Sequence, residues 1–225
     1  RSHMAWSADQ GKGHSTYGRI GVRRLPENPD GKLGIEDIGL SMAAESEGES
    51  RVALVNMENT HNQSDGTPID PAWTASFAEG VHDRGAVLHI DGARLFNAAV
   101  ALDVPASALV ADADSATFCL SKGLACPIGG IVAGSSDYIA EVHNRRKIVG
   151  GEMRQTGVIS AAGIVALNSM VDRMADDHAN ARRLAEGLAQ ISGISIEPER
   201  VTTNILYFKL SDRTPEELEQ SLAEE

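Results

Sequence analysis

The stretch AVLHIDGARLF, residues 86–96, joins an apolar run directly to charged residues. Residues 86–91 have the length and apolar content of a buried strand, and Asp91 stands where that strand ends. Arg94 follows three residues later, within a segment over residues 93–101 that predicts a short helix. We therefore expect a strand that leads at once into a helix, with a carboxylate at the junction.

Strand and helix patterns alternate along most of the chain. Strands are predicted over residues 51–57, 86–91, 115–120 and 130–133, and a helix starts at about Pro71, because proline suits a first helical turn. Residues 26–38 predict a turn and then the start of a helix, and residues 44–50 a loop. Alternating strands and helices form mostly parallel sheets that are covered on both faces. We therefore expect an α/β fold.

The C-terminal part is predicted to be helical and then mixed. Residues 157–174 are rich in Ala, Ile, Val and Met, as expected of a packed helix, and residues 176–191 carry an apolar stripe. A strand over residues 204–210, followed by a capping box at Thr214 and Glu217, predicts the start of a small α+β domain.

These patterns suggest a division of the chain into three parts. Residues 1–4 have the sequence of a cloning remnant. Residues 5–175 are expected to form a large domain whose N-terminal part lies outside this sequence. Residues 176–225 are expected to form a connecting helix and part of a small domain.

The composition indicates a globular protein and disfavours several classes of partner. The chain has 225 residues, of which 42% are hydrophobic, and a formal net charge of −12. Nucleic acids and anionic membranes attract basic surfaces, so neither is expected as a partner. Cys119 and Cys126 lack the companion residues of a zinc site or a disulfide scaffold, so we expect no metal and a reducing cytoplasm. No apolar segment approaches the roughly 20 residues of a membrane span.

A second stretch, CLSKGLACPIGG (residues 119–130), repeats the arrangement with a lysine. Ligands of open α/β sheets bind beyond the carboxyl ends of the strands, so Asp91 and Lys122 are expected at one edge. A buried carboxylate needs a partner, and the protonated ring nitrogen of pyridoxal phosphate is one. Lys122 would then be the amine that forms a Schiff base with this cofactor.

Each of these residues also has a purely structural explanation. An aspartate at a strand end more often caps the next helix, and a single lysine after a strand is usually solvated. His61, within ENTHN (residues 58–62), is more often a surface or turn histidine. Burial of Lys122 among Leu120, Leu124 and Pro127 would distinguish it from a solvated lysine, because burial favours the uncharged amine.

Four motifs in order connect these residues. They are ENTHN (58–62), LHIDGARLFNAAVA (88–101), SKGLACPIGG (121–130) and RRKIVGGEMRQTGVISAAG (145–163). Together they resemble successive signatures of the threonine aldolase and aromatic amino-acid β-eliminating lyase family, and most closely those of its low-specificity L-threonine aldolases. The resemblance spans about residues 31–210. It implies a three-layer, aspartate aminotransferase-like fold of the fold type I pyridoxal-phosphate enzymes.

The resemblance also implies roles for single residues. Lys122 would be the Schiff-base lysine, and Asp91 would bind the pyridine nitrogen and keep it protonated. Arg94 would lie near the ring and its phenolic oxygen. His61 would sit near the β-hydroxyl of the substrate and remove its proton, directly or through water.

Arg154 and Lys147 would approach the cofactor phosphate, either that of their own subunit or that of a neighbouring subunit. The implied reaction is the retro-aldol cleavage of L-threonine or L-allo-threonine to glycine and acetaldehyde, in a homodimer or homotetramer. Two alternatives stay open at this point. One is a non-catalytic or incomplete relative that keeps the scaffold, and the other is a β-eliminating lyase or transaminase.

Overall fold

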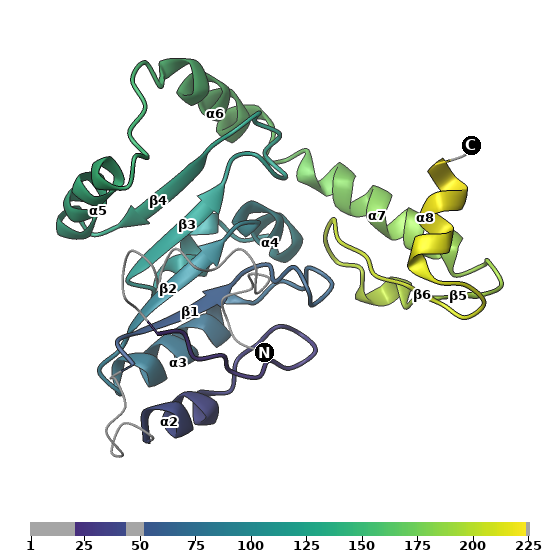
Figure 1. Cartoon of the computed structure of the whole chain (residues 1–225), viewed down its shortest axis with the longest axis horizontal. Coiled ribbons are helices and arrows are strands. Elements are labelled where there is room, and N and C mark those ends of the chain that lie inside the picture. Colours follow the sequence, from purple (N-terminus) through teal and green to yellow (C-terminus); the bar gives the residue numbers. More distant parts are fainter. Residues whose placement is uncertain (1–20, 44–51, 224–225) are drawn as a thin grey trace.

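The computed structural model describes residues 21–43 and 52–223, so the expected cloning remnant and the loop over residues 44–50 lie outside the described residues. Figure 1 shows the arrangement of the helices and strands. In chain order they are α2 (Ile35–Ala43), β1 (Leu54–Glu58), α3 (Pro71–His82), β2 (Val87–Gly92), α4 (Leu95–Leu102), η2 (Ala106–Val110), β3 (Ser115–Cys119), β4 (Gly130–Gly134), α5 (Ser136–Ile148), α6 (Gly157–Ser169), α7 (Met174–Leu188), β5 (Ile194–Ser195), η3 (Pro198–Arg200), β6 (Lys209–Leu210) and α8 (Pro215–Ala223).

The main sheet has the order β1-β2-β3-β4. The first three strands are parallel, and their register places Glu58 opposite Asp91 and Asp91 opposite Thr117. β4 runs antiparallel to β3. The loop between these two strands contains no helix that would carry the chain back to the starting edge, so the chain reverses direction. The expected mostly parallel α/β sheet is confirmed, and β4 is the reversed strand.

One face of the sheet forms the core with α2 and α3, which lie together along β1 and β2 (Figure 1). Asp70 caps α3 by accepting the N–H of Trp73 at 2.8 Å, and Pro71 occupies the first turn, as expected. The buried residues of this face alternate along β1 and β2 and meet two side chains of α3; they are Val55, Met57, Leu88, Ile90, Phe77 and Val81. Each buried side chain of this size contributes about 1.5–3 kcal/mol.

The helix expected over residues 157–174 is corrected in two respects. α6 ends at Ser169, and after a short turn α7 begins at an angle of 72° to it. α6 buries only Gly163 and Ala166, while Val158 is 82% exposed. The expectation of a packed helix is therefore wrong, because only the side of α6 that faces Leu120 contacts the described chain.

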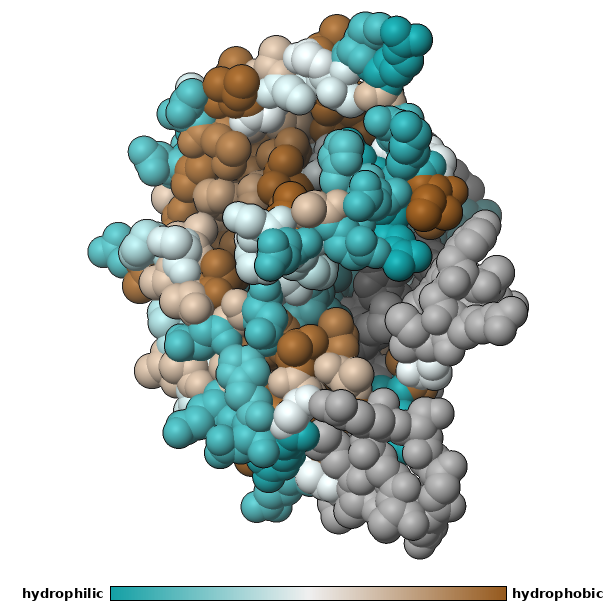
Figure 2. Space-filling model, turned by 90° about the vertical axis from the view of Figure 1, so that its left-hand side faces the viewer, coloured by the Kyte–Doolittle hydropathy of each residue, from teal (hydrophilic) through white to brown (hydrophobic). Residues whose placement is uncertain are grey.

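An apolar surface extends over β4 and α6. All five residues of β4 are exposed. Apolar side chains gather in the upper part of the face shown in Figure 2, at the level of these elements. We define the β4–α6 surface by Ile128, Ile131, Val132, Val158, Ile164 and Val165, which are all exposed. Contiguous apolar surfaces of this kind mark contact sites.

α7 leads away from the sheet to a small unit formed by β5, β6 and α8 (Figure 1). The strand expected over residues 204–210 pairs only at Lys209 and Leu210, because its partner β5 is equally short. The capping box is confirmed: the N–H of Thr214 donates to Glu217 at 2.8 Å, and the N–H of Glu217 donates to Thr214 at 3.2 Å.

Within the described residues, no single helix is long and apolar enough to cross a membrane. Taken together, the bent pair of α6 and α7 is long and apolar enough to cross a membrane, by length and composition only.

Gly92 controls how closely β2 approaches its neighbours. A Cβ atom at this position would lie 2.6 Å from the carbonyl oxygen of Thr117 and 2.9 Å from Cβ of Leu95. We expect Gly92→Ala to lower the free energy of unfolding by about 1–3 kcal/mol through overpacking, measured by urea denaturation.

Gly187→Ala is the matched control for Gly92→Ala. Nothing lies within 4 Å of a Cβ atom at Gly187, so this change is expected to be neutral or to stabilise α7 by up to about 1 kcal/mol. Equal stability of the two variants would contradict the close packing of β2 on β3.

Candidate functional site

The three parallel strands end at one edge of the main sheet (Figure 1), and acidic and basic residues stand at these ends or just after them. Glu58 ends β1, Asp91 lies opposite it on β2, and Lys122 follows β3. The charges of Asp91, Lys122 and Arg94 all act on the Glu58 carboxyl. The structure therefore brings together three of the predicted site residues, at the edge of the sheet where α/β proteins bind ligands.

Asp91 is half-buried at the turn from β2 into α4. The N–H of Ala93 donates to its Oδ1 at 3.0 Å, which fixes the orientation of the carboxylate. Between described residues Asp91 forms no ion pair within 4 Å. The hydrogen bond from Ala93 confirms the local turn that the sequence suggests, and it involves only one of the two carboxylate oxygens.

The loop that carries Lys122 is held by backbone hydrogen bonds. The N–H of Ala125 donates to the carbonyl of Lys122 at 2.8 Å, and the N–H of Leu120 donates to Gly129 at 2.9 Å. Leu120 and Leu124 are buried, but Lys122 and Pro127 are exposed. Burial of the lysine is thus not borne out by this structure, and its amine makes no ion pair with a described residue.

The backbone of this loop approaches its neighbours closely at Gly123. A Cβ atom there would lie 2.7 Å from Oδ1 of Asn97 on α4 and 3.1 Å from Cε of Met174 on α7. The loop therefore passes tightly between two helices. Asn97 is itself held toward α7, because its amide nitrogen lies 3.1 Å from Nε2 of His178.

His61 lies buried between three polar side chains. Its Nδ1 is 2.9 Å from Oγ of Ser64, and its Nε2 is 3.2 Å from Oε2 of Glu27 and 3.7 Å from Oε2 of Glu58. Burial lowers the pKa of His61 below its ordinary value, and the negative charges of Glu27 and Asp91 only partly offset this. His61 is therefore uncharged at neutral pH, the form that accepts a proton.

Asn59 anchors the loop that holds His61. Its side chain is fully buried. The Nδ2 of Asn59 donates to the carbonyl of Ile69 at 2.9 Å, and the N–H of Ile69 donates to Oδ1 at 3.1 Å. This pair of hydrogen bonds closes the loop over residues 59–69 and holds His61 beside Glu58, the last residue of β1.

The residues that sequence reasoning missed are Glu27, Glu58 and Ser64. Burial, followed by the charge of Asp91, raises the pKa of Glu58 to about 8, although Lys122, Arg94 and the N–H of Asn62 act in the opposite direction. The signal for Glu58 was present, because it ends an apolar strand just as Asp91 does. Glu27 comes from a distant segment and carries no such signal.

Arg154 and Lys147 are not brought into this cluster. Lys147 is at the end of α5, and its exposed Nζ lies 3.8 Å from Glu152. Arg154 is exposed in the segment before α6. Within the described chain, no hydrogen bond or ion pair joins either residue to Asp91 or Lys122.

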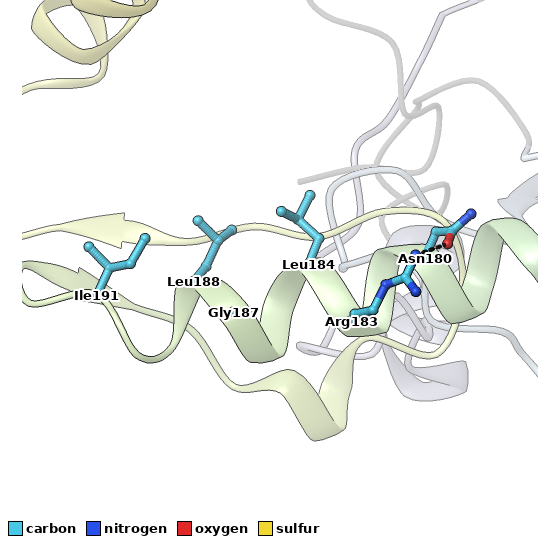
Figure 3. Close-up of a pocket in the computed structure, with 6 residues that line it drawn as sticks. All are labelled: Asn180, Arg183, Leu184, Gly187, Leu188 and Ile191. Carbon is cyan, nitrogen blue, oxygen red and sulfur yellow. Dashed lines mark hydrogen bonds between the residues drawn. The ribbon is translucent and has the colours of Figure 1, made fainter.

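A separate hollow of about 690 Å³ lies on α7 (Figure 3). Leu184, Leu188 and Ile191 project along one side of the helix there. This hollow contains none of the clustered titratable residues. The candidate site is therefore the carboxyl edge of the sheet, where a carboxylate and an amine could together hold a cofactor with a protonated ring nitrogen and an aldehyde.

Comparisons with known proteins agree with this assignment. Residues 1–211 match the family described as Beta-eliminating lyase. The Low-specificity L-threonine aldolase 1 of Arabidopsis thaliana is 38% identical over 218 residues, which cover 94% of this chain and 61% of that protein. The Low specificity L-threonine aldolase of Escherichia coli (strain K12) is 34% identical over 200 residues, which cover 89% of this chain and 58% of that protein.

The chain thus spans less than two thirds of the length of these curated relatives. The solved structure of Leishmania major threonine aldolase matches with a TM-score of 0.69 at 18% identity, over 83% of this chain and 55% of that chain. This likeness confirms the fold class that the sequence motifs imply.

The Asn59 anchor can be tested by removal. Asn59→Ala leaves both backbone groups of Ile69 without partners in a buried place, so we expect a loss of about 2–4 kcal/mol in the free energy of unfolding. Asn28→Ala is the control, since the Asn28 side chain likewise makes two hydrogen bonds to the backbone, accepting the N–H groups of Asp30 and Lys32 at 3.0 Å each, but is exposed to water. We expect less than about 1 kcal/mol there, and similar losses in both variants would refute the anchor.

Proposed function

Because the chain belongs to the beta-eliminating lyase family, we propose that it is a pyridoxal-phosphate-dependent lyase that cleaves L-threonine or L-allo-threonine to glycine and acetaldehyde. One observation carries this proposal: Asp91 lies near the end of β2 and Lys122 follows the neighbouring β3, at one edge of the sheet. The substrate class is supported by the two curated relatives, which are named low-specificity L-threonine aldolases.

The residues at the site fit this cofactor. Asp91 offers a half-buried carboxylate whose second oxygen has no charged partner among the described residues, as a protonated ring nitrogen requires. Lys122 offers an exposed amine on a loop that the backbone holds in place. Arg94 directly precedes α4, close enough for its charge to act on Glu58. When bound, pyridoxal phosphate withdraws electrons from the bonds at the α-carbon of an amino acid.

Each residue would then have a distinct task. Lys122 would bind the aldehyde carbon of the cofactor through its amine. Asp91 would keep the ring nitrogen protonated by a charge-assisted hydrogen bond worth about 1.5–3 kcal/mol, and Arg94 would lie near the ring. His61, uncharged because it is buried, would accept the proton of the β-hydroxyl directly or through water.

The reaction is balanced by two proton transfers. The β-hydroxyl loses its proton to His61 as the bond between Cα and Cβ breaks, and acetaldehyde leaves. The α-carbon then takes up one proton, and glycine is the second product. The amino group stays on glycine and the β-oxygen leaves in acetaldehyde, so keto acids are not expected.

We extend the proposal to assembly, location and domains. The protein would be a homodimer or homotetramer, with Lys147 and Arg154 directed to the cofactor phosphate of a neighbouring subunit. Both side chains are exposed and make no ion pair or hydrogen bond with Asp91 or Lys122 among the described residues, which supports this arrangement. The free thiols of Cys119 and Cys126 suit a reducing compartment such as the cytoplasm. A large domain over residues 5–175 would precede the connecting helix and partial small domain.

Trapping of the cofactor tests the role of Lys122. We expect borohydride reduction in the presence of pyridoxal phosphate to add the reduced cofactor to the peptide that contains Lys122, as measured by mass spectrometry. Lys122→Ala should remove this adduct, because no other amine follows β3 at that position. Lys209→Ala, at an exposed strand end, is the control and should keep it. An adduct that survives in Lys122→Ala would overturn the assignment.

Product analysis tests the reaction. Glycine and acetaldehyde from threonine, without keto acid, are the expected products. Ammonia released together with pyruvate from serine or tryptophan would favour a β-eliminating lyase, and keto acid without free ammonia would favour a transaminase. Cofactor binding without any product would favour a scaffold relative.

The β4–α6 surface provides a test of assembly. Val158 is the most exposed apolar side chain there, at 82%. We expect Val158→Glu to increase the monomer fraction in light scattering, because a charge in an apolar interface is costly. Leu222→Glu on α8, where Leu222 is 64% exposed, is the control and should leave the mass unchanged. An unchanged mass for Val158→Glu would place the subunit contact elsewhere.

A further inference from the structure

Glu58 occupies a position that the proposed chemistry does not use. It ends β1 directly opposite Asp91 and is 7% exposed. Among the described residues, its Oε2 has no hydrogen-bond partner, and it lies 3.7 Å from Nε2 of His61. Oε2 of Glu27 lies 3.2 Å from the same nitrogen and likewise accepts no hydrogen bond from the part of the chain that the structure describes. The carboxyls of Glu27 and Glu58 therefore both face Nε2 of the buried His61. A third carboxyl, that of Asp91, stands opposite Glu58 on β2.

The charges around Glu58 come from every element packed against it. Asp91 on β2 and Glu27 before α2 are acidic, and His61 lies between Glu27 and Glu58. Lys122 after β3 and Arg94 before α4 are basic. Both basic groups are needed by the proposed cofactor site, so they cannot serve only as partners of Glu58. An additional buried negative charge beside Asp91 is costly, and protonation of one carboxyl removes that cost.

We propose that Glu58 is a positioning residue: as a neutral carboxylic acid it keeps His61 uncharged and leaves Asp91 as the charged carboxyl of the pair at the ends of β1 and β2. An ionised Glu58 would draw a proton onto His61, which could then no longer accept one from a substrate. It would also compete with Asp91 for a cationic ring. The role in the reaction rests on the proposed function, but the protonation state of Glu58 does not.

Stability as a function of pH tests the protonation state without cofactor. The pKa of Glu58 is raised in the folded chain from 4.5 to about 8. Its contribution to stability is therefore complete below pH 4.5 and is lost as the pH rises through about 8. Glu58→Gln has the shape of the neutral acid and cannot ionise. We expect the folding equilibrium constant of Glu58→Gln, relative to that of the wild type, to rise about 100-fold or more between about pH 5 and about pH 9.

Glu79→Gln is the matched control, because Glu79 is exposed on α3. Its relative folding constant should be the same at both pH values. The proposal is overturned if the Glu58→Gln ratio is also constant, or if Glu58→Gln loses stability at the higher pH, since an ionised and required carboxylate would behave in that way.

The pH profile of glycine formation tests the role of the proton. We expect the wild-type rate to fall above about pH 8 and the rate of Glu58→Gln to persist to higher pH. A stability result as expected, with no glycine from either protein, would refute the proposed function and retain the neutral carboxyl. Glycine formation with identical pH profiles would retain the function and refute the positioning role.

Discussion

The parallel alignment of β1, β2 and β3 is the constraint on which the site depends. Parallel strands end at the same edge of a sheet, so residues that are far apart in sequence meet there. Glu58, Asp91 and Lys122 each follow or end one of these strands. The apolar face that packs on α3 fixes the register, since a shift by one residue would expose the core and turn the carboxyls inward. The hydrophobic core thus determines the chemistry at the edge.

The site combines rigid and accessible groups. Asp91 is oriented by a backbone N–H, and the histidine loop is closed by the buried amide of Asn59. Lys122, in contrast, is exposed on a loop. This division suits a lysine that must exchange partners while the carboxylate beside it stays fixed. The order of the site comes from hydrogen bonds to the backbone, and surface ion pairs contribute little.

Much of the fold could be predicted because its signals are local. The proline and aspartate at the start of α3, the apolar run of β2 and the capping box of α8 each depend on residues close in sequence. Strand direction depends on what connects two strands, so the reversal of β4 was not evident. The apolar composition of α6 predicts burial, but whether a partner element covers it is a property of the whole assembly.

The candidate site could be predicted only in part, because some of its residues carry local signals and others do not. Asp91 is recognisable as a charged residue at the end of an apolar strand, and Lys122 as one that follows such a strand. Glu58 has the same pattern, but its unusual protonation comes from Asp91 on the next strand and from burial that no local pattern shows. The contact between Glu27 and His61 joins segments that no motif connects.

β4 has a consequence for the behaviour of the protein at high concentration. It is the last strand of the sheet among the described residues, and its sequence, Gly-Ile-Val-Ala-Gly, has no charged residue and no proline. Those are the devices by which edge strands usually prevent growth of a sheet from one molecule to the next. An uncovered β4 would therefore act as a template for cross-β aggregation, which makes its coverage a condition of solubility as well as of assembly.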